Sequence, residues 1–324
     1  MNPLLYPFFS GKNSKFRYFL ERTAGDLLLP DALFRRRRDA LLAAVDARPD
    51  RADILARADY CNKLRAASPL PADAPRLADF RPDRKGQVYY FDAREITRYF
   101  PRDLRWRFLP GDITHVPAEP TVVKSRPIAG DNANSVLLCL NKVRHFTFVR
   151  DRTPFCDKRD TAVFRGKVCS KPKRLRLFET LFGAPGFDLG DTDSRPGVPA
   201  EWKTPKRTIR EQLECKFVLA IEGNDVASGL KWILSSNSLA LMPRPEYETW
   251  FLEGTLVPNV HYVEIAPDYS DAAEKMRWYA AHPDAAQKIL DAAHAHVARF
   301  RDPRRELLVS LLVMQRYFEF TNPT

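Results

Sequence analysis

The sequence predicts an α/β fold in two domains, and two observations support this prediction. The chain has 324 residues, which is enough for two domains of roughly 100–200 residues each. The stretch Cys215–Pro243 has the pattern of strand, turn, helix and strand: Phe217–Ile221 and Leu239–Met242 are apolar runs, and Val226–Leu234 carries apolar residues at helical spacing. A continuous apolar run is typical of a strand buried on both faces of a parallel sheet.

The remaining elements continue this alternation of strands and helices. Residues 13–66 have helical periodicity, and the proline-containing stretch 68–86 predicts a loop. Further strands are expected at Val88–Phe91, Arg105–Leu109, Ala162–Lys167 and Phe187–Thr192, with Val136–Leu140 as a strand or a short helix. Further helices are expected at Ala93–Tyr99, Leu175–Phe182, Thr208–Glu214 (with Thr208 and Glu211 as a capping box), Asp271–Trp278, His282–Val297 and Glu306–Phe320.

The net positive charge of the chain favours anionic partners. The net charge is +11, mostly from arginine, and Arg35–Arg38 is the densest run. Nucleic acid, an anionic membrane surface and a polyanionic substrate all fit such a balance, and so does a solvated basic face. We find no nucleic-acid-binding motif, and no run approaches the ~18 apolar residues of a membrane span. The N-terminal stretch, broken by Pro3 and Pro7, is not expected to be a signal peptide.

Cysteine and histidine spacing argues against a metal site. The five cysteines are scattered and never at CxxC spacing, which is typical of reduced thiols in a cytosolic protein. His294 and His296 are two residues apart on a predicted helix and so face different ways. We therefore expect no metal bound by protein ligands.

The turn after Ile221 is a candidate phosphate site. In a βαβ unit this turn lies at the carboxyl end of the sheet, where backbone N–H groups favour an anion. Asn224 or Asp225 can cap the helix, and a carboxylate at Glu222 suits the paired hydroxyls of a sugar. An ordinary capped connection is the alternative. The residues assigned to this site are Glu222, Gly223, Asn224, Asp225, Val226, Ala227, Ser228 and Lys231.

Two other polar segments are candidates for ligand binding. Lys124–Ser135 contains two cations, one carboxylate and two carboxamides, which are costly to bury unless they pair or bind something. A surface loop with Asx turns is the alternative interpretation. Arg165, with the basic residues up to Arg174, precedes an apolar helix and could clamp a diphosphate or form simple surface charge.

Several motifs in order carry a resemblance to a known family. The motifs are Lys124–Ile128, Asn134–Leu138, Phe164–Gly166, Glu222–Trp232 and Tyr247–Val263. Over about residues 85–300 the chain resembles the family 90 glycosyltransferases, which include lipopolysaccharide-modifying enzymes and eukaryotic protein O-glucosyltransferases. The resemblance implies a GT-B architecture, in which two Rossmann-like domains face a cleft, and an inverting, metal-independent transfer from a UDP-sugar. The helix dipole and arginines would then stabilise the UDP leaving group.

The resemblance also implies site roles. The preferred general base is Asp131, with Asp112 as runner-up. Donor binding is assigned to Arg165 and Arg174 together with the turn after Ile221. Lys124, Arg126 and Asn134 are assigned to an anionic acceptor such as a lipopolysaccharide core.

The resemblance also organises the chain into regions. The expected regions are a helical N-terminal part (1–84), an acceptor domain (85–158, together with parts of 1–84), a donor domain (159–300) and a C-terminal helix (301–324) that packs back on the first domain. Without a secretory signal or retention tetrapeptide, we expect a bacterial cytoplasmic enzyme, peripheral at the inner membrane. The alternatives are a non-catalytic polyanion-binding module, a transferase that has lost its acceptor, and a protein O-glucosyltransferase. No cofactor is expected besides the UDP-sugar co-substrate.

Overall fold

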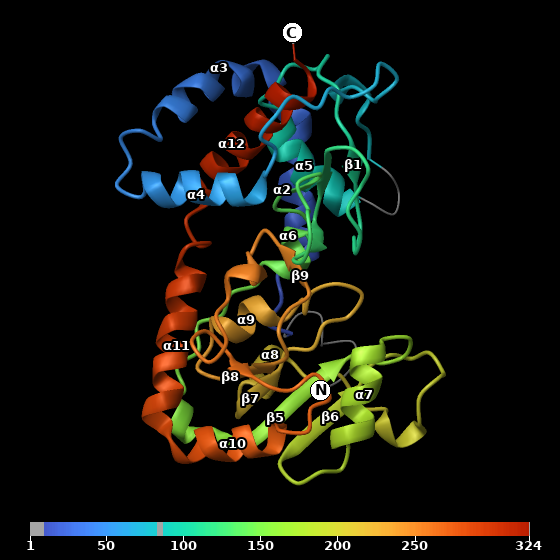
Figure 1. The fold of residues 1–324 in the computed structure, drawn as a ribbon, viewed down its shortest axis with the longest axis vertical. Helices are drawn as coiled ribbons and strands as arrows, with labels where there is room; N and C mark the ends of the chain where they lie inside the picture. Colours follow the sequence, from blue (N-terminus) through green and yellow to red (C-terminus); the bar gives the residue numbers. More distant parts are fainter. Residues whose placement is uncertain (1–9, 83–86, 324) are drawn as a thin grey trace. The chain divides into compact units, whose positions relative to one another are not determined.

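The computed structural model describes residues 10–82 and 87–323, which form two compact units (Figure 1). Unit 1 contains residues 10–14, Arg144–Pro245 and Glu253–Arg299, and unit 2 contains Lys15–Val143, Glu246–Leu252 and residues 300–323. The long first segment of unit 2 ends at Val143, where the chain enters unit 1. The sequence instead predicted this domain boundary after residue 158. The N-terminal stretch that is not expected to be a signal peptide covers residues 1–12, of which 1–9 lie outside the described residues. The donor and acceptor roles of the domains stay predictions.

Unit 1 is built on a five-stranded parallel sheet. Its strands are β5 (Arg159–Gly166), β6 (Phe187–Asp191), β7 (Cys215–Leu219), β8 (Leu239–Met242) and β10 (Val263–Glu264). The spatial order is β10-β8-β7-β5-β6, with all neighbours parallel. After β6 the chain returns to the other side of β5 to form β7, so the direction of winding reverses between β5 and β7. This order matches the doubly wound α/β class of sheet.

Three helices cover one face of this sheet. They are α7 (Pro172–Leu181), α10 (Ala272–Ala281) and α11 (Pro283–Ala298) (Figure 1). Alternate strand residues such as Phe164, Phe217 and Leu241 are buried in one cluster with side chains of these helices. Burial of both sheet faces explains why β7 and β8 are continuous apolar runs. The predicted strands at these positions and the three helices are confirmed.

The connection between β7 and β8 differs from the prediction. Helix α9 is only Leu230–Leu234, and its N-cap is Gly229 rather than Asn224 or Asp225. The preceding residues form a loop in which Gly223 N–H donates to the Asp225 carbonyl. The expected capping box, by contrast, is present: Thr208 and Glu211 cap α8 (Ile209–Gln212) reciprocally.

Unit 2 combines helices with a smaller sheet. The parallel strands β1 (Phe108–Leu109), β2 (Thr121–Val123) and β4 (Ser135–Leu137) lie in the order β1-β2-β4, and β3 (Ser125–Pro127) pairs antiparallel with β9 (Tyr247–Thr249). The helices are α2 (Lys15–Leu28), α3 (Asp31–Ala43), α4 (Arg51–Cys61), α5 (Gln87–Thr97) and α12 (Pro303–Thr321). An α/β fold is therefore present in both units, and residues 13–66 are helical as predicted.

Helix α12 connects the parts of unit 2. It packs against α3, α4 and α5, and its side of the core includes Leu308, Met314 and Tyr317. The Tyr317 hydroxyl accepts from the Arg107 backbone N–H at 2.8 Å and donates to the Pro120 carbonyl at 3.0 Å. Among the described residues, the chain forms no helix with both the length and the apolarity to cross a membrane.

The predicted strand at Val88–Phe91 is wrong, because these residues belong to helix α5. Tyr90, Ala93 and Ile96 are buried at helical spacing, so tertiary packing overrides the strand preference of the Val-Tyr-Tyr-Phe run. Asp92, on the same helix, is fully buried. Its carboxylate accepts from the Tyr18 hydroxyl at 2.7 Å and from the Lys142 backbone N–H at 2.9 Å.

The buried Asp92 predicts a pH-dependent stability. Burial raises the pKa of Asp92 from 3.8 to about 6, so its contribution to stability is present below pH ~4 and is lost as the pH rises through 6. Asp92→Asn removes this titration. Relative to wild type, its free energy of unfolding should therefore rise by about 3 kcal/mol from pH 4 to pH 7 in urea unfolding. The exposed Asp73→Asn should follow the wild type, and parallel curves for Asp92→Asn would contradict the prediction.

Candidate functional site

The candidate site of unit 1 lies at the carboxyl ends of β5 and β7. In doubly wound sheets, ligands bind where the winding direction reverses, outside the carboxyl ends of the two strands concerned. Here that place is formed by the loop after Gly166 and the loop after Leu219. Arg174, on the first turn of α7, extends its side chain between the two loops.

The Arg174 guanidinium bonds only to backbone carbonyls. Its Nη1 donates to Lys167 O at 2.9 Å, its Nη2 donates to Ile221 O at 2.9 Å, and Nε lies 3.2 Å from the carbonyls of Ile221 and Glu222. The guanidinium carbon also lies 5.5 Å from the centre of the Phe164 ring. Arg174 therefore joins the loops that follow β5 and β7.

Two glycines make room for this guanidinium. A Cβ added at Gly223 would lie 3.0 Å from Arg174 Nη2, and one at Gly166 would lie 2.9 Å from the Phe164 ring and 3.4 Å from Arg174 Nη1. At Gly223 the close neighbour is thus a side chain of the protein itself. Gly229 is different, because its nearest neighbour is the Trp232 ring at 3.0 Å.

The charge of Arg174 is not balanced by a carboxylate. Burial, followed by the nearby Arg144, lowers the pKa of Arg174 to about 10, against smaller opposite effects from Tyr269 and Asp225. Within residues 10–82 and 87–323, Arg174 forms no ion pair. A partly buried cation beside a second cation is unfavourable until an anion binds. Arg144 was not found from the sequence, since its place beside Arg174 depends on the fold.

The loop after β7 adds three backbone donors. In the described part of the chain, the N–H groups of Val226, Ala227 and Ser228 have no hydrogen-bond acceptor, and the first two residues are buried. Buried N–H groups almost always have partners in proteins. Successive backbone N–H groups in a loop form an anion-binding concavity. The assignment of this turn to phosphate therefore gains a structural basis that does not require a long helix.

Basic side chains at the start of α7 contact the same turn. Lys171 Nζ donates to the Asn224 carboxamide oxygen, and Lys173 pairs with Glu222. The Glu222 side chain is largely buried. The structure thus brings Arg174, Glu222, Gly223 and Asn224 together.

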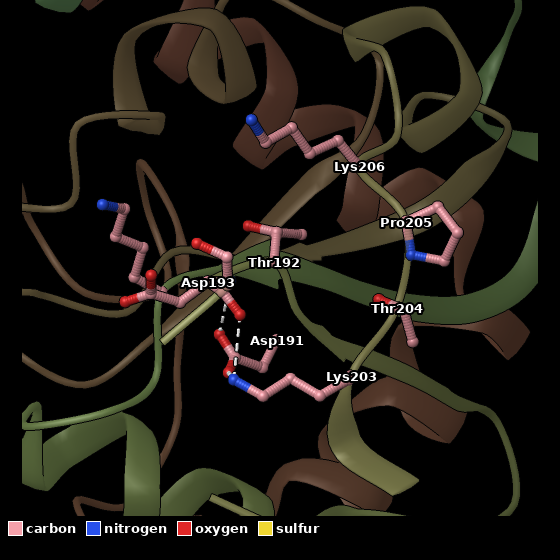
Figure 2. Close-up of a pocket in the computed structure, with 9 residues that line it drawn as sticks. Asp191, Thr192, Asp193, Lys203, Thr204, Pro205 and Lys206 are labelled. Carbon is pink, nitrogen blue, oxygen red and sulfur yellow. Dashed lines mark hydrogen bonds and ion pairs between the residues drawn. The ribbon is translucent and has the colours of Figure 1, made fainter. Parts of the chain in front are cut away.

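A pocket of about 510 Å³ adjoins this place at the ends of β5 and β6 (Figure 2). Its lining consists of Lys167, Asp191–Ser194 and Lys203–Lys206. The buried Asp191 carboxylate accepts from the backbone N–H groups of Val168 and Asp193, and Lys203 Nζ lies 2.7 Å from it. Lys167 belongs to both places, because its carbonyl bonds to Arg174. Sequence reasoning missed this pocket.

Two residues assigned to the donor form ion pairs instead. Arg165 Nη2 lies 2.6 Å from Asp188 Oδ1, and the Arg165 side chain is 6% exposed and that of Asp188 is 30% exposed. Lys231 Nζ lies 2.5 Å from Glu253 Oε1, and both side chains are buried. Their donor-binding roles stay predictions without support from these contacts.

Unit 2 has a charged pair at the carboxyl edge of its parallel sheet. Asp112 follows β1 and Lys124 follows β2, and Lys124 Nζ lies 2.5 Å from Asp112 Oδ1. The Lys124 side chain is 1% exposed, whereas that of Asp112 is 24% exposed. A partly exposed carboxylate oriented by a buried lysine is available to a ligand at this edge.

The other predicted residues of unit 2 lie elsewhere. Asp131 is exposed, and its Oδ1 accepts from the Ala133 backbone N–H at 3.0 Å, which is an Asx turn. Asn134 donates to the Pro117 and Ala118 carbonyls at the amino end of β2. Both residues precede the start of β4. The structure therefore places them toward the amino edge of the sheet, away from Asp112.

Arg126 lies in a buried network. Its Nε lies 2.8 Å from Glu248 Oε1, and Nη1 and Nη2 donate to the Ser135 and Tyr60 carbonyls. The Tyr60 hydroxyl donates to Glu248 Oε2 at 2.6 Å. The Arg126 and Glu248 side chains are 0% and 1% exposed. These contacts give Arg126 a structural part in joining α4, β3 and β9.

The described residues contain no group of three or more His, Cys, Asp or Glu side chains that could hold a metal ion.

Comparison with known proteins defines the class of the chain. It belongs to glycosyl transferase family 90, whose family model matches residues 140–302, a range that contains the whole Arg174 site. The resemblance predicted from the sequence motifs is thereby confirmed, and the chain is a glycosyltransferase.

Two curated relatives make the likeness more specific. The chain is 39% identical over 298 residues to O-glucosyltransferase LpsA of Dichelobacter nodosus, covering 91% of this chain and 93% of that protein. It is 26% identical over 168 residues to Protein O-glucosyltransferase 3 of Homo sapiens, covering 50% of this chain and 32% of that protein.

The buried network predicts that Arg126 acts in stability. Arg126→Met leaves the buried Glu248 without its guanidinium partner, so the free energy of unfolding should fall by about 3–5 kcal/mol in urea unfolding. The double variant Arg126→Met/Glu248→Gln should recover part of this loss, because it removes the unbalanced charge. Unchanged stability with a raised KM for the acceptor would instead support the acceptor role assigned from the sequence.

Proposed function

We propose that the protein transfers glucose from UDP-glucose to a saccharide acceptor, with inversion and without a metal ion. The observation that carries the proposal is that Arg174, which forms no ion pair among the described residues, bonds to the loop after β7, where the N–H groups of Val226, Ala227 and Ser228 have no described acceptor. The choice of glucose rests on the names of the two relatives. Other hexoses and pentoses remain competitors in the donor test.

The proposed role of the Arg174 site is to bind the diphosphate of the donor. Negative charge grows on the leaving UDP as the glycosidic bond to the sugar breaks. A partly buried guanidinium and fixed N–H donors stabilise that charge without reorganisation, which is the role of a metal ion in other enzymes. The loop Val226–Ser228 and Arg174 supply both kinds of donor. The adjoining pocket offers space for the rest of the nucleotide.

Inversion by direct displacement requires a carboxylate that takes the proton of the acceptor hydroxyl. Contacts favour Asp112 for this role, because it lies at the carboxyl edge of the unit 2 sheet and Lys124 orients its Oδ1. Asp131, preferred from the sequence, is exposed in an Asx turn. We therefore propose Asp112 as the base and keep Asp131 as the competitor that mutagenesis must separate.

The proposed acceptor is an anionic surface glycan such as a lipopolysaccharide core, reached from the cytoplasm at the inner membrane. Its support is the net charge of +11. Lys124 and Arg126 are buried in ion pairs, so exposed basic residues would have to recognise the acceptor charge. A serine- or threonine-containing protein is the second candidate acceptor, and it rests on the printed name of the human relative.

The diphosphate role predicts a loss of UDP affinity. Arg174→Met should raise the Kd for UDP by about 10- to 100-fold, the usual worth of a hydrogen bond to a charged group, as measured by calorimetry. Arg176→Met on the same helix is the matched control, because Arg176 is exposed, and its Kd should stay within about twofold. Melting curves check that Arg174→Met folds. Equal Kd values for the two variants would remove Arg174 from the site.

The base assignment predicts a separation of turnover from binding. Asp112→Asn should lower kcat for acceptor-dependent UDP release by about 10²-fold or more while UDP affinity stays near wild type. Asp131→Asn should stay within about threefold. The reverse order would identify Asp131 as the base. Activity of the wild type with UDP-glucose should survive EDTA; loss of activity in EDTA would contradict the metal-independent mechanism.

A further inference from the structure

The connection between α2 and α3 exposes large apolar side chains. Leu28 is 77% exposed, Leu29 46% and Leu33 48%. These three leucines lie within six residues of sequence, at the end of α2 and the first turn of α3. Exposed apolar groups that gather in one place mark a surface that contacts a partner.

Helix α3 is attached to unit 2 by one side only. The Phe34 ring lies 5.2 Å from the Tyr99 ring, and the Arg98 guanidinium lies over Phe34 at 3.8 Å. Among the described side chains of α3, none is buried. The helix also contacts α12 (Figure 1). Its remaining side presents Leu33, Arg36 and Arg37 to solvent.

The outward side of α3 is positively charged. The helix contains four arginines and two aspartates. Asp31 binds Arg94 at 2.6 Å, and Asp39 binds Arg38 at 2.9 Å. Arg36 and Arg37 form no ion pair with any residue in the described ranges. The two carboxylates of the helix are thus taken by other arginines.

We propose that this surface, formed by Leu28, Leu29, Leu33, Arg36 and Arg37, docks onto an anionic phospholipid bilayer. Helices that lie in the membrane interface carry leucines beside arginines. The apolar side chains insert below the lipid headgroups, and the cations lie among the headgroups. Each arginine near an anionic surface strengthens binding about fivefold. The bilayer supplies both chemistries over one flat surface.

Neither a second copy of the chain nor nucleic acid matches both the charge and the apolarity of this surface. A second copy of the chain would bring the arginines of two copies together, which is unfavourable. Nucleic acid offers phosphates but no apolar layer for three exposed leucines. The inference goes beyond glucosyl transfer, and it is tested without donor or acceptor.

The experiment measures binding of the full chain to vesicles by co-sedimentation. Vesicles containing phosphatidylglycerol should bind the wild type, pure phosphatidylcholine should bind it weakly, and added salt should weaken the anionic binding. Arg36→Gln/Arg37→Gln should lower the partition coefficient roughly 30-fold, at about fivefold for each arginine. Leu28→Ser/Leu29→Ser should lower it by about tenfold or more.

Matched variants control for total charge and apolarity. Arg150→Gln/Arg152→Gln removes two exposed arginines of unit 1, and Val257→Ser/Val260→Ser removes two exposed apolar side chains there. Both should bind as wild type. The proposal is overturned if the wild type ignores anionic vesicles, if each control weakens binding as much as its test variant, or if the leucine variant only abolishes self-association in solution. UDP binding, measured in parallel, tests the proposed donor site, and its outcome does not depend on whether the protein binds vesicles.

Discussion

The half-buried guanidinium of Arg174 forms the interactions on which the candidate donor site depends. It bonds to carbonyls of the loops after β5 and β7, so one side chain sets the spacing of both loops. A buried cation is costly unless polar groups surround it, and here these groups are neutral carbonyls. The same contacts that hold the loops therefore leave positive charge for an anion. Glycine at positions 166 and 223 follows from this arrangement, because a Cβ at either position would crowd the guanidinium or the Phe164 ring beneath it.

In unit 2, Lys124 and Arg126 are close in sequence but have different structural roles. Lys124 follows β2 and reaches a partly exposed carboxylate, Asp112, at the carboxyl edge of the parallel sheet. Arg126 lies in β3, which turns away to pair with β9, and it meets the buried Glu248. One cation therefore orients a carboxylate at the carboxyl edge of the sheet, whereas the other stabilises the packing of α4, β3 and β9. Mutation of Lys124 should therefore affect mainly turnover, and mutation of Arg126 should affect mainly stability.

Much of unit 1 could be predicted from the sequence. Buried parallel strands such as β7 and β8 are continuous apolar runs, and the capping box at Thr208 is a local pattern, so both are visible without tertiary information. The first residues of helix α5 were missed because their side chains favour a strand locally, and only packing selects the helix. The sheet edge at which Asp131 lies was not predicted, because sequence order cannot tell which edge of a sheet a loop occupies.

The sequence by itself determined the α/β class, the family and the presence of a polar turn after β7, because these depend on local periodicity and on motifs in order. Only the tertiary structure decided which charges are available. Arg165, Lys231 and Arg126 are paired with carboxylates distant in sequence, whereas Arg174 meets carbonyls and the like charge of Arg144. Whether a cation binds a ligand or stabilises the fold depends on its neighbours in space, and those neighbours are brought together only by the sheet topology.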